Sequence, residues 1–425
     1  MTALSTADHE LLLRLLRIPT ENPLESERAD NDLPGAQRLY AAAAAEAGFR
    51  TVLHAAPDPA VLDRDDVPLV VRERAAEPGF LAAQPSLVLR LGPPGLPTVM
   101  FNVHLDTVAG QEPVGFDGAR FTGRGAIDAK GPAVALLAGV RAARPVLDSV
   151  GVLVQAVAGE EGGAMGTYGT RPLVEAGFTG RLNVFCEPTG LRYATRSTAA
   201  MTACVEADGT GSIDDRPDAG HNATVLLGFL AQHLAAELDG AEPGGRVCVA
   251  GLHTGDAHNR VYGSGRLLFN LSYPTRDAGR RLERRVTEAV WSGVAEFRRR
   301  FAGTRELRRT AEDAARVVSL RWAKRGLPAL DCRDTWATAL LDDAGVAPWP
   351  AGEPAFTCDA IWLAGVPDAA TVVLGPGCLA DNNAHAGGEF AELTQLDTFA
   401  GTVTRVLTEF AARCRPEEDH VPDAS

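Results

Sequence analysis

Strand-like and helix-like runs alternate between residues 86 and 188, and they read SLVLRL (86–91), TVMFNVHLD (98–106), GPAVALLAGVRAA (131–143), VGVLVQAVAG (150–159) and LNVFCEP (182–188). Each β-rich run is short, and glycine or proline residues separate it from its neighbours. Such alternation is typical of an α/β domain with a largely parallel central sheet. Because ligands in open α/β sheets bind outside the carboxyl ends of the strands, the polar residues that follow these runs are candidate site residues.

The pattern changes after about residue 195. A two-faced strand (198–209) precedes an amphipathic helix (222–238), two further strands (246–255 and 265–274), a basic-faced helix (278–301) and a closing strand (317–322). This order predicts a smaller α+β sandwich. We therefore expect a first domain made of residues 1–195 and 326–425, with the second domain, residues 196–325, inserted into it.

The charge balance limits the possible partners. The 425 residues include 41 Lys and Arg against 55 Asp and Glu, which gives a net charge of −14. Nucleic acid and anionic membranes are disfavoured, since either needs a basic face. No apolar run approaches the ~20 residues of a membrane-spanning helix, and the first twenty residues lack the features of a signal peptide. We expect a cytoplasmic protein whose seven cysteines are reduced thiols, because no CxxC pair occurs.

Histidine and carboxylate residues follow the predicted strands. His104 and Asp106 end the run TVMFNVHLD, and residues two apart on a strand face the same way, so the imidazole could bind a metal while the carboxylate orients its ring. Asp128 lies in the glycine-flanked turn GRGAIDAKG (123–131), where the alternative is a helix N-cap. Each of these features is also compatible with an ordinary structural role.

Further acidic residues follow later strands. Glu160 and Glu161 come directly after VGVLVQAVAG, where a solvated turn is the alternative, Glu187 follows LNVFC, and His385 lies far downstream, with Glu389 four residues beyond it. Adjacent buried carboxylates repel one another and need a metal or a proton. Taken together with His104 and Asp128, they form a mixed nitrogen and oxygen donor set suited to Zn²⁺, Co²⁺ or Mn²⁺.

At this point the chain resembles a known family. The ordered motifs FNVHLDTV, GRGAIDAKG, AGEEGG, CEP and GPG…AHAGGE are similar to those of the M20 metallopeptidases and amidohydrolases, which include acetylornithine deacetylase, succinyl-diaminopimelate desuccinylase, aminoacylase and glutamate carboxypeptidase. The resemblance implies a dinuclear metallohydrolase domain with an inserted lid or dimerisation domain. It also implies two divalent cations, most simply zinc, with cobalt or manganese possible, and a homodimer formed through the lid domain.

The resemblance assigns the metal ligands position by position. It places His104, Asp128 and Glu187 around one cation, and Asp128, Glu161 and His385 around the other, so that Asp128 bridges the two.

The resemblance also implies the chemistry. Asp106 would hold His104, Glu160 would be the general base, and a non-proline cis bond would follow Asp128. The two cations would lower the pKa of a bridging water, Glu160 would accept its proton, the hydroxide would attack an amide carbonyl, and Glu160 would return the proton to the leaving amine.

The second domain departs from the family pattern. Ile213 stands where the family has a histidine that stabilises the oxyanion, and Ser272 stands where an arginine usually binds the substrate carboxylate. An apolar side chain cannot donate to an oxyanion. Asn259 matches an asparagine that the family uses near the substrate. The remaining candidates for substrate contacts are Arg216, His221, His258 and Arg260, although each of the first three is also compatible with a structural role.

We therefore expect an active metal-dependent hydrolase of C–N amide bonds. Its substrate would be a small N-acyl amino acid, a dipeptide-like molecule or a specialised metabolite. Two alternatives stay open at this stage, which are amide formation or acyl transfer at the same dinuclear site, and a metal-containing dimer that binds without turnover.

Overall fold

The computed structural model describes residues 4–28 and 30–414. The chain forms two compact units. The first contains the chain up to residue 63, residues 71–197 and the chain from residue 331, and the second contains residues 64–70 and 198–330. The second unit thus begins two residues after the predicted boundary, ends five residues after it, and includes a short upstream segment that the sequence pattern did not assign to it.

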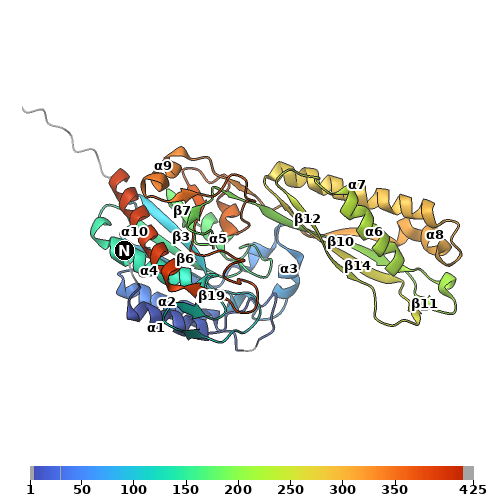
Figure 1. The fold of residues 1–425 in the computed structure, drawn as a ribbon, viewed down its shortest axis with the longest axis horizontal. Helices are drawn as coiled ribbons and strands as arrows, with labels where there is room; N and C mark the ends of the chain where they lie inside the picture. Colours follow the sequence, from blue (N-terminus) through green and yellow to red (C-terminus); the bar gives the residue numbers. More distant parts are fainter. Residues whose placement is uncertain (1–3, 29, 415–425) are drawn as a thin grey trace, which may run out of the picture. The chain divides into compact units, whose positions relative to one another are not determined.

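A six-stranded mixed sheet forms the centre of the first unit (Figure 1). Its order is β1-β2-β6-β3-β7-β18, with bounds Arg50–Ala55, Ser86–Leu91, Gly151–Val157, Thr98–His104, Leu182–Phe185 and Ala370–Val373. The last four strands in this order run parallel, whereas β1 and β2 are antiparallel to their neighbours. Every residue of β3 and β6 is buried, as expected for strands covered on both faces. The predicted α/β class is confirmed, with a mixed sheet.

The helices of this unit are α1 (Thr6–Arg17), α2 (Leu33–Glu46), α3 (Leu69–Ala75, which begins in the segment of the second unit), α4 (Lys130–Ala143), α5 (Thr170–Glu175), α9 (Thr335–Asp343) and α10 (Leu393–Cys414). Helices α4 and α10 lie side by side (Figure 1). A Cβ atom on Gly139 of α4 would lie only 2.6 Å from the Ala400 carbonyl oxygen of α10, so glycine permits the close approach. The C-terminal helix therefore packs directly on the helix that follows the Asp128 turn.

Short elements complete the first unit. A small sheet has the order β19-β5-β4, with bounds Phe390–Glu392, Arg120–Thr122 and Gly115–Phe116. Two-residue strands are β8 (Arg192–Tyr193), β9 (Arg196–Ser197), β16 (Leu330–Asp331) and β17 (Ala347–Pro348). Among the described residues, 3₁₀ helices cover Pro59–Leu62, Leu81–Ala83, Arg144–Val146 and Asp359–Leu363 in the first unit and Pro217–Ala219 and Arg305–Leu307 in the second.

The second unit is an antiparallel sheet covered by helices. The sheet order is β12-β14-β10-β15, with bounds Arg246–His253, Ser264–Tyr273, Ala199–Asp208 and Val318–Lys324. Alternate residues of β14, from Leu267 to Tyr273, are buried, which is the pattern of a sheet with one covered face. The helices are α6 (Ala223–Glu237), α7 (Arg276–Phe301) and α8 (Arg308–Val317). Strands β11 (Ser212–Ile213) and β13 (Arg260–Val261) pair as a separate two-stranded antiparallel sheet.

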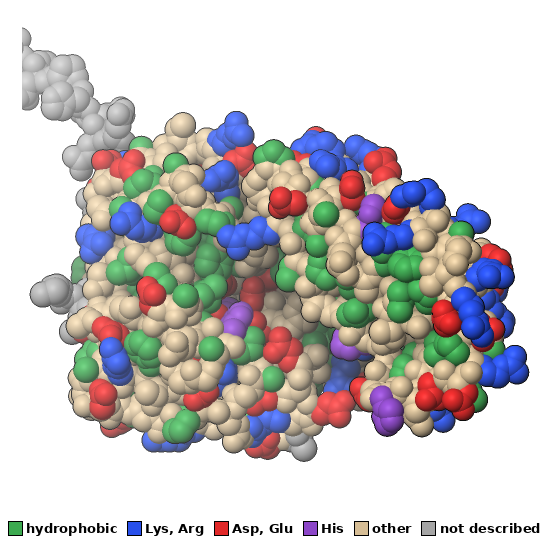
Figure 2. Space-filling view, turned by 45° about the vertical axis from the view of Figure 1, so that its right-hand side comes forward, with side chains coloured by type: hydrophobic (Ala, Val, Ile, Leu, Met, Phe, Trp, Pro, Cys, Tyr) green, Lys and Arg blue, Asp and Glu red, His purple; other side chains and the backbone are tan. Residues whose placement is uncertain are grey.

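The surface of the second unit is locally basic. Residues 276–316 contain twelve arginines against seven acidic residues, and Figure 2 shows Lys and Arg side chains gathered on the visible face of this unit. The expectation that nucleic acid is not a partner rests on the net charge of the whole chain and stays a prediction. Within the described residues, no helix combines the length and the apolar character needed to cross a bilayer. All seven cysteines are free thiols.

Candidate metal centre

The candidate site lies at the carboxyl ends of the parallel strands of the first unit. His104 is the last residue of β3, Glu160 and Glu161 follow β6, and Glu187 follows β7. Asp128 occupies the turn before α4 and precedes the predicted cis bond, Asp128–Ala129. Because the strands are parallel, their carboxyl ends meet at one edge of the sheet, which explains why residues distant in sequence converge.

Asp128 lies at the centre of this arrangement. One of its carboxylate oxygens is 2.8 Å from His104 Nε2, and the other is 3.1 Å from His385 Nε2. His385 Nε2 is also 3.0 Å from Glu161 Oε1. The ligand atoms of three residue groups lie within 4.8 Å of one another, namely His104 with Asp128 and Glu187, Asp128 with Glu161 and His385, and His104 with Glu160 and Glu161. The structure thus brings together all five predicted ligands and the predicted base.

The exposure of these side chains differs. His104, Asp128, Glu161 and Glu187 are each at most 5 % exposed, whereas the side chain of His385 is 48 % exposed. Burial of several carboxylates in one place is costly unless protons or cations compensate their charge.

The pKa values of the clustered side chains reflect this cost of burying charge. Burial raises the pKa of Glu161 to about 7 and that of Glu187 to about 8, and neighbouring carboxylates add to both shifts. Burial, followed by the charge of Glu187, holds the pKa of Glu160 well above its usual range. Hydrogen bonds to Asp128 and Glu161 raise the pKa of His385 to about 10. Divalent cations would compensate the same charge, and the donor set of two imidazoles and carboxylates fits Zn²⁺, Co²⁺ or Mn²⁺.

Asp106 makes different contacts from those predicted. His104 Nδ1 donates to the backbone carbonyl oxygen of Asp106 at 2.8 Å, whereas the nearest carboxylate oxygen of Asp106 is 3.9 Å away. The other carboxylate oxygen accepts from Asn22 Nδ2 at 2.9 Å and from the Glu161 backbone N–H at 3.1 Å. The carboxylate thus holds the Glu161 segment, and the ring of His104 is oriented by main chain. The strand alternation predicted a shared face but not which oxygen the ring would use.

Two buried residues near the site were not among the candidates predicted from the sequence. Asn22, which is fully buried, donates to Asp106 and to the Glu161 carbonyl oxygen. Asp359 is also fully buried, accepts from Thr170 Oγ1 at 2.6 Å, and has a pKa raised to about 7, chiefly by burial. Neither follows a predicted strand, so the strand-end criterion could not find them.

The predicted substrate contacts lie in the second unit. His221 is buried, its Nδ1 accepts from the Thr210 N–H at 2.8 Å, and its Nε2 lies 2.9 Å from Asp313 Oδ2. Both ring nitrogens are thus engaged, so the prediction of His221 as a substrate contact is replaced by a structural role. The other four candidates, Arg216, His258, Asn259 and Arg260, are exposed. Ile213 pairs with Arg260 between β11 and β13 and is 54 % exposed.

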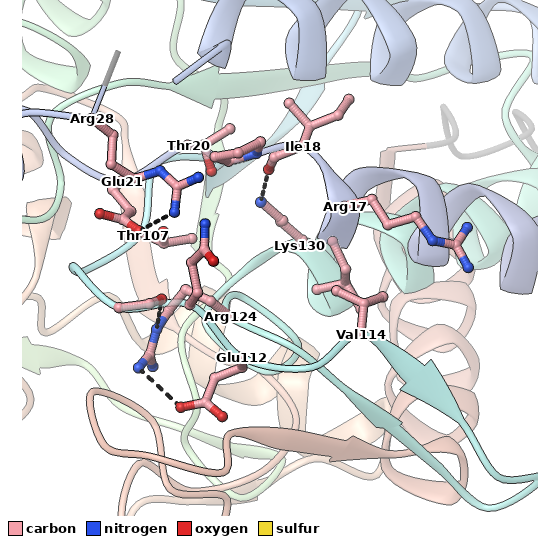
Figure 3. Close-up of a pocket in the computed structure, with 14 residues that line it drawn as sticks. Arg17, Ile18, Thr20, Glu21, Arg28, Thr107, Glu112, Val114, Arg124 and Lys130 are labelled. Carbon is pink, nitrogen blue, oxygen red and sulfur yellow. Dashed lines mark hydrogen bonds and ion pairs between the residues drawn. The ribbon is translucent and has the colours of Figure 1, made fainter. Parts of the chain in front are cut away.

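A polar cavity of about 240 Å³ lies beside the Asp128 turn in the first unit (Figure 3). It is lined by the end of α1, the segment around Thr107 to Val114, and the side chains of Arg28, Arg124 and Lys130. The buried Lys130 ammonium donates to the carbonyl oxygens of Leu15 and Ile18 at 3.1 and 2.9 Å. Lys130 therefore fastens the end of α1 to the start of α4 and supports the turn from one side.

Comparisons with solved structures agree with the fold. The chain resembles a tripeptidase of Staphylococcus aureus (13 % identity, TM-score 0.71, covering 97 % of this chain and all of that one) and a metallo-carboxypeptidase of Sulfolobus solfataricus (11 %, TM-score 0.69, covering 96 % and all). At these identities the likeness shows the fold alone.

A curated relative is closer in sequence. It is a protein of Aeropyrum pernix named as a [LysW]-lysine/[LysW]-ornithine hydrolase, 33 % identical over 187 residues, which is 44 % of this chain. The chain spans about half the length of this relative. The sequence model of peptidase family M20/M25/M40 matches residues 100–409, which include every residue of the candidate metal centre. The chain belongs to peptidase family M20/M25/M40.

Proposed function

We propose that this protein is a metal-dependent hydrolase of C–N amide bonds that uses two divalent cations. His104, Asp128 and Glu187 would hold one, and Asp128, Glu161 and His385 would hold the other. The observation that supports the proposal most strongly is the position of Asp128, whose two carboxylate oxygens face two different histidines. Zinc fits the donor set best, and cobalt and manganese are also compatible with it. When bound, the cations lower the pKa of a water and polarise the amide carbonyl.

Glu160 is the proposed general base. Its carboxylate lies close to the imidazole of His104 and the carboxylate of Glu161, and no hydrogen bond within the described part of the chain occupies it. It is therefore free to accept a proton from water and to return it to the leaving amine. Burial, followed by the charge of Glu187, keeps its pKa above the usual range, which makes it a stronger base than a free glutamate.

The proposed substrate is a small acylated amino acid. The relative from Aeropyrum pernix is named as acting on lysine and ornithine conjugates. We therefore include an amide that releases lysine or ornithine among the N-acyl amino acid and dipeptide-like substrates expected from the sequence. The exposed residues Arg216, His258, Asn259 and Arg260 remain proposed substrate contacts.

We also propose a cytoplasmic homodimer formed through the second unit. The edge strand β12 supports this assembly, because most of its residues are exposed and Leu252 is 44 % exposed. An edge strand with unpaired backbone groups is a ready template for pairing with a second chain.

One experiment tests the reaction itself. Purified protein loaded with zinc is incubated in ¹⁸O-labelled water with acetyl, succinyl and aminoacyl derivatives of lysine, ornithine and glutamate, and the products are weighed by mass spectrometry. Hydrolysis places one solvent oxygen in the released carboxylate. Release of the amine without ¹⁸O in the acyl product would indicate acyl transfer instead of hydrolysis. Stoichiometric binding of zinc without turnover of any amide would favour a metal-containing protein that binds its ligand without catalysis.

A further inference from the structure

Glu389 is a buried carboxylate with four donors and no assigned role. It is 1 % exposed, and it lies four residues after His385, directly before strand β19. Its Oε1 accepts from the backbone N–H groups of Ile127 and Asp128 at 3.0 and 3.2 Å. Its Oε2 accepts from the Gly125 N–H at 3.0 Å and from Arg124 Nη1 at 2.8 Å. A single side chain thus holds the backbone of the turn that carries Asp128.

The same contacts join the turn to the segment that carries His385. Arg124 Nη2 donates to the carbonyl oxygen of Ala386 at 3.0 Å, and the Gly123 N–H donates to the carbonyl oxygen of Glu389 at 3.2 Å. Residues 123–128 and 385–389 are therefore fastened at three points, although more than 250 residues separate them in sequence.

His385 needs such support more than the other site residues do. Its side chain is half exposed, and its backbone has a φ of +62°, a conformation that non-glycine residues rarely adopt. Strand packing positions His104, whereas no regular element contains His385. The contacts between these two segments are therefore among those that position its ring relative to Asp128, together with the hydrogen bond to Glu161.

We infer that Glu389 is a positioning residue that sets the spacing of Asp128 and His385, with Arg124 as its partner. The inference rests on the proposed function, in which these two side chains share a cation. A carboxylate is required, because four donors converge on it. In glutamine one of the two oxygens becomes an NH₂ group, which would face two donors and accept from neither. The backbone N–H of Asp128 or that of Gly125 would then lose its partner.

Glu389→Gln is the test, and Glu392→Gln is the matched control. Glu392 lies three residues further along, at the end of β19, and its carboxylate pairs with Arg120 at the surface. Two measurements are made on the full chain, which are amide hydrogen exchange of residues 123–130 in metal-free protein and zinc affinity by chelator competition. We expect faster exchange and zinc binding about 10- to 100-fold weaker in Glu389→Gln, the range typical when the partner of a metal ligand is altered. Glu392→Gln should match the wild type in both.

Arg124→Met provides a second variant in case Glu389→Gln does not fold. It removes one of the four donors and the contact with Ala386, so the same two changes are expected at smaller amplitude. A cobalt-loaded sample adds a readout of ligand geometry, because its visible spectrum should shift in both variants and not in the control.

The outcomes separate this inference from the proposed function. Zinc affinity and a cobalt spectrum equal to those of the wild type would overturn the inference, even if exchange became faster. A wild-type protein that binds two zinc ions and hydrolyses no amide would refute the proposed function, while weaker zinc binding in Glu389→Gln would still support the positioning role.

Discussion

Replacement of Glu160 by glutamine separates proton transfer from metal binding. Glu160 and Glu161 are adjacent, yet the structure gives them different surroundings. Glu161 Oε1 lies 3.0 Å from His385 Nε2 and its backbone N–H is held by Asp106, whereas the carboxylate of Glu160 has no hydrogen-bond partner among the described residues. Glutamine has the same shape, so at position 160 it should remove only the ability to accept a proton.

The expected magnitude follows from this separation. A positioned general base contributes typically 10²–10⁴-fold to the rate, which corresponds to about 3–5 kcal/mol of transition-state stabilisation. We therefore expect kcat of Glu160→Gln to fall by about 10²–10⁴-fold while the zinc content stays the same. Glu160 lies near Glu187 and Glu161, and the negative charges of these carboxylates repel one another. A neutral glutamine at position 160 removes part of this repulsion, so it should not destabilise the cluster.

The assay compares two neighbouring variants. Turnover of an acylated amino acid is measured beside zinc content by atomic absorption for wild type, Glu160→Gln and Glu161→Gln. Glu161→Gln should lose part of the zinc, and its activity should recover in part when zinc is added in excess, whereas Glu160→Gln should not recover. An unchanged kcat in Glu160→Gln, or loss of zinc from it, would refute the assignment of Glu160 as the base.

Three further outcomes test the structure. Burial raises the pKa values of Glu161 and Glu187 in the folded protein to about 7 and 8, so these groups stabilise the metal-free protein at low pH and lose that contribution as the pH rises through 7–8. The unfolding temperature measured in the presence of a chelator should therefore fall between pH 6 and 9, and it should fall less in the presence of zinc. A rise of the unfolding temperature over this range would contradict the argument from burial. Lys130→Met should cost about 2–4 kcal/mol in urea unfolding, because two carbonyl oxygens lose their donor, and a loss below ~1 kcal/mol would show that water replaces it. Ile213→His should raise hydrolysis of simple N-acyl amino acids by on the order of 10² if an oxyanion donor is missing there, and an unchanged rate would mean that another group already supplies it.

The candidate ligands could be predicted because each follows a strand of the parallel sheet or belongs to a short motif. Strand ends are visible in the apolar pattern, and parallel pairing brings them to one edge. His104 and Glu187 are examples, since each follows a buried run directly. The α/β class could be predicted from the alternation of strand-like and helix-like runs. The antiparallel pairing of β1 and β2 could not, because no feature of the sequence indicates the direction of these two strands.

Contacts that run through the main chain could not be predicted. Glu389 accepts from three backbone N–H groups, and any residue supplies such a group, so no residue type at the other end marks the contact. The ring of His104 uses a carbonyl oxygen for the same reason. For His221 the sequence predicted a substrate contact, whereas the structure shows a contact with Asp313. Asp313 lies 92 residues further along the chain, and nothing in the sequence around His221 indicates this pairing.

The spread of the site along the chain has a consequence for biosynthesis. Asp128 receives its contacts from His385 and Glu389, and α10, which packs against the helix after Asp128, comes later still. At the usual elongation rates of about 5–20 residues per second, the ribosome needs roughly 15–55 s to travel from His104 to His385. During that interval the early half of the cluster exists without its counterpart, so cation uptake at the complete site has to wait until His385 has been synthesised.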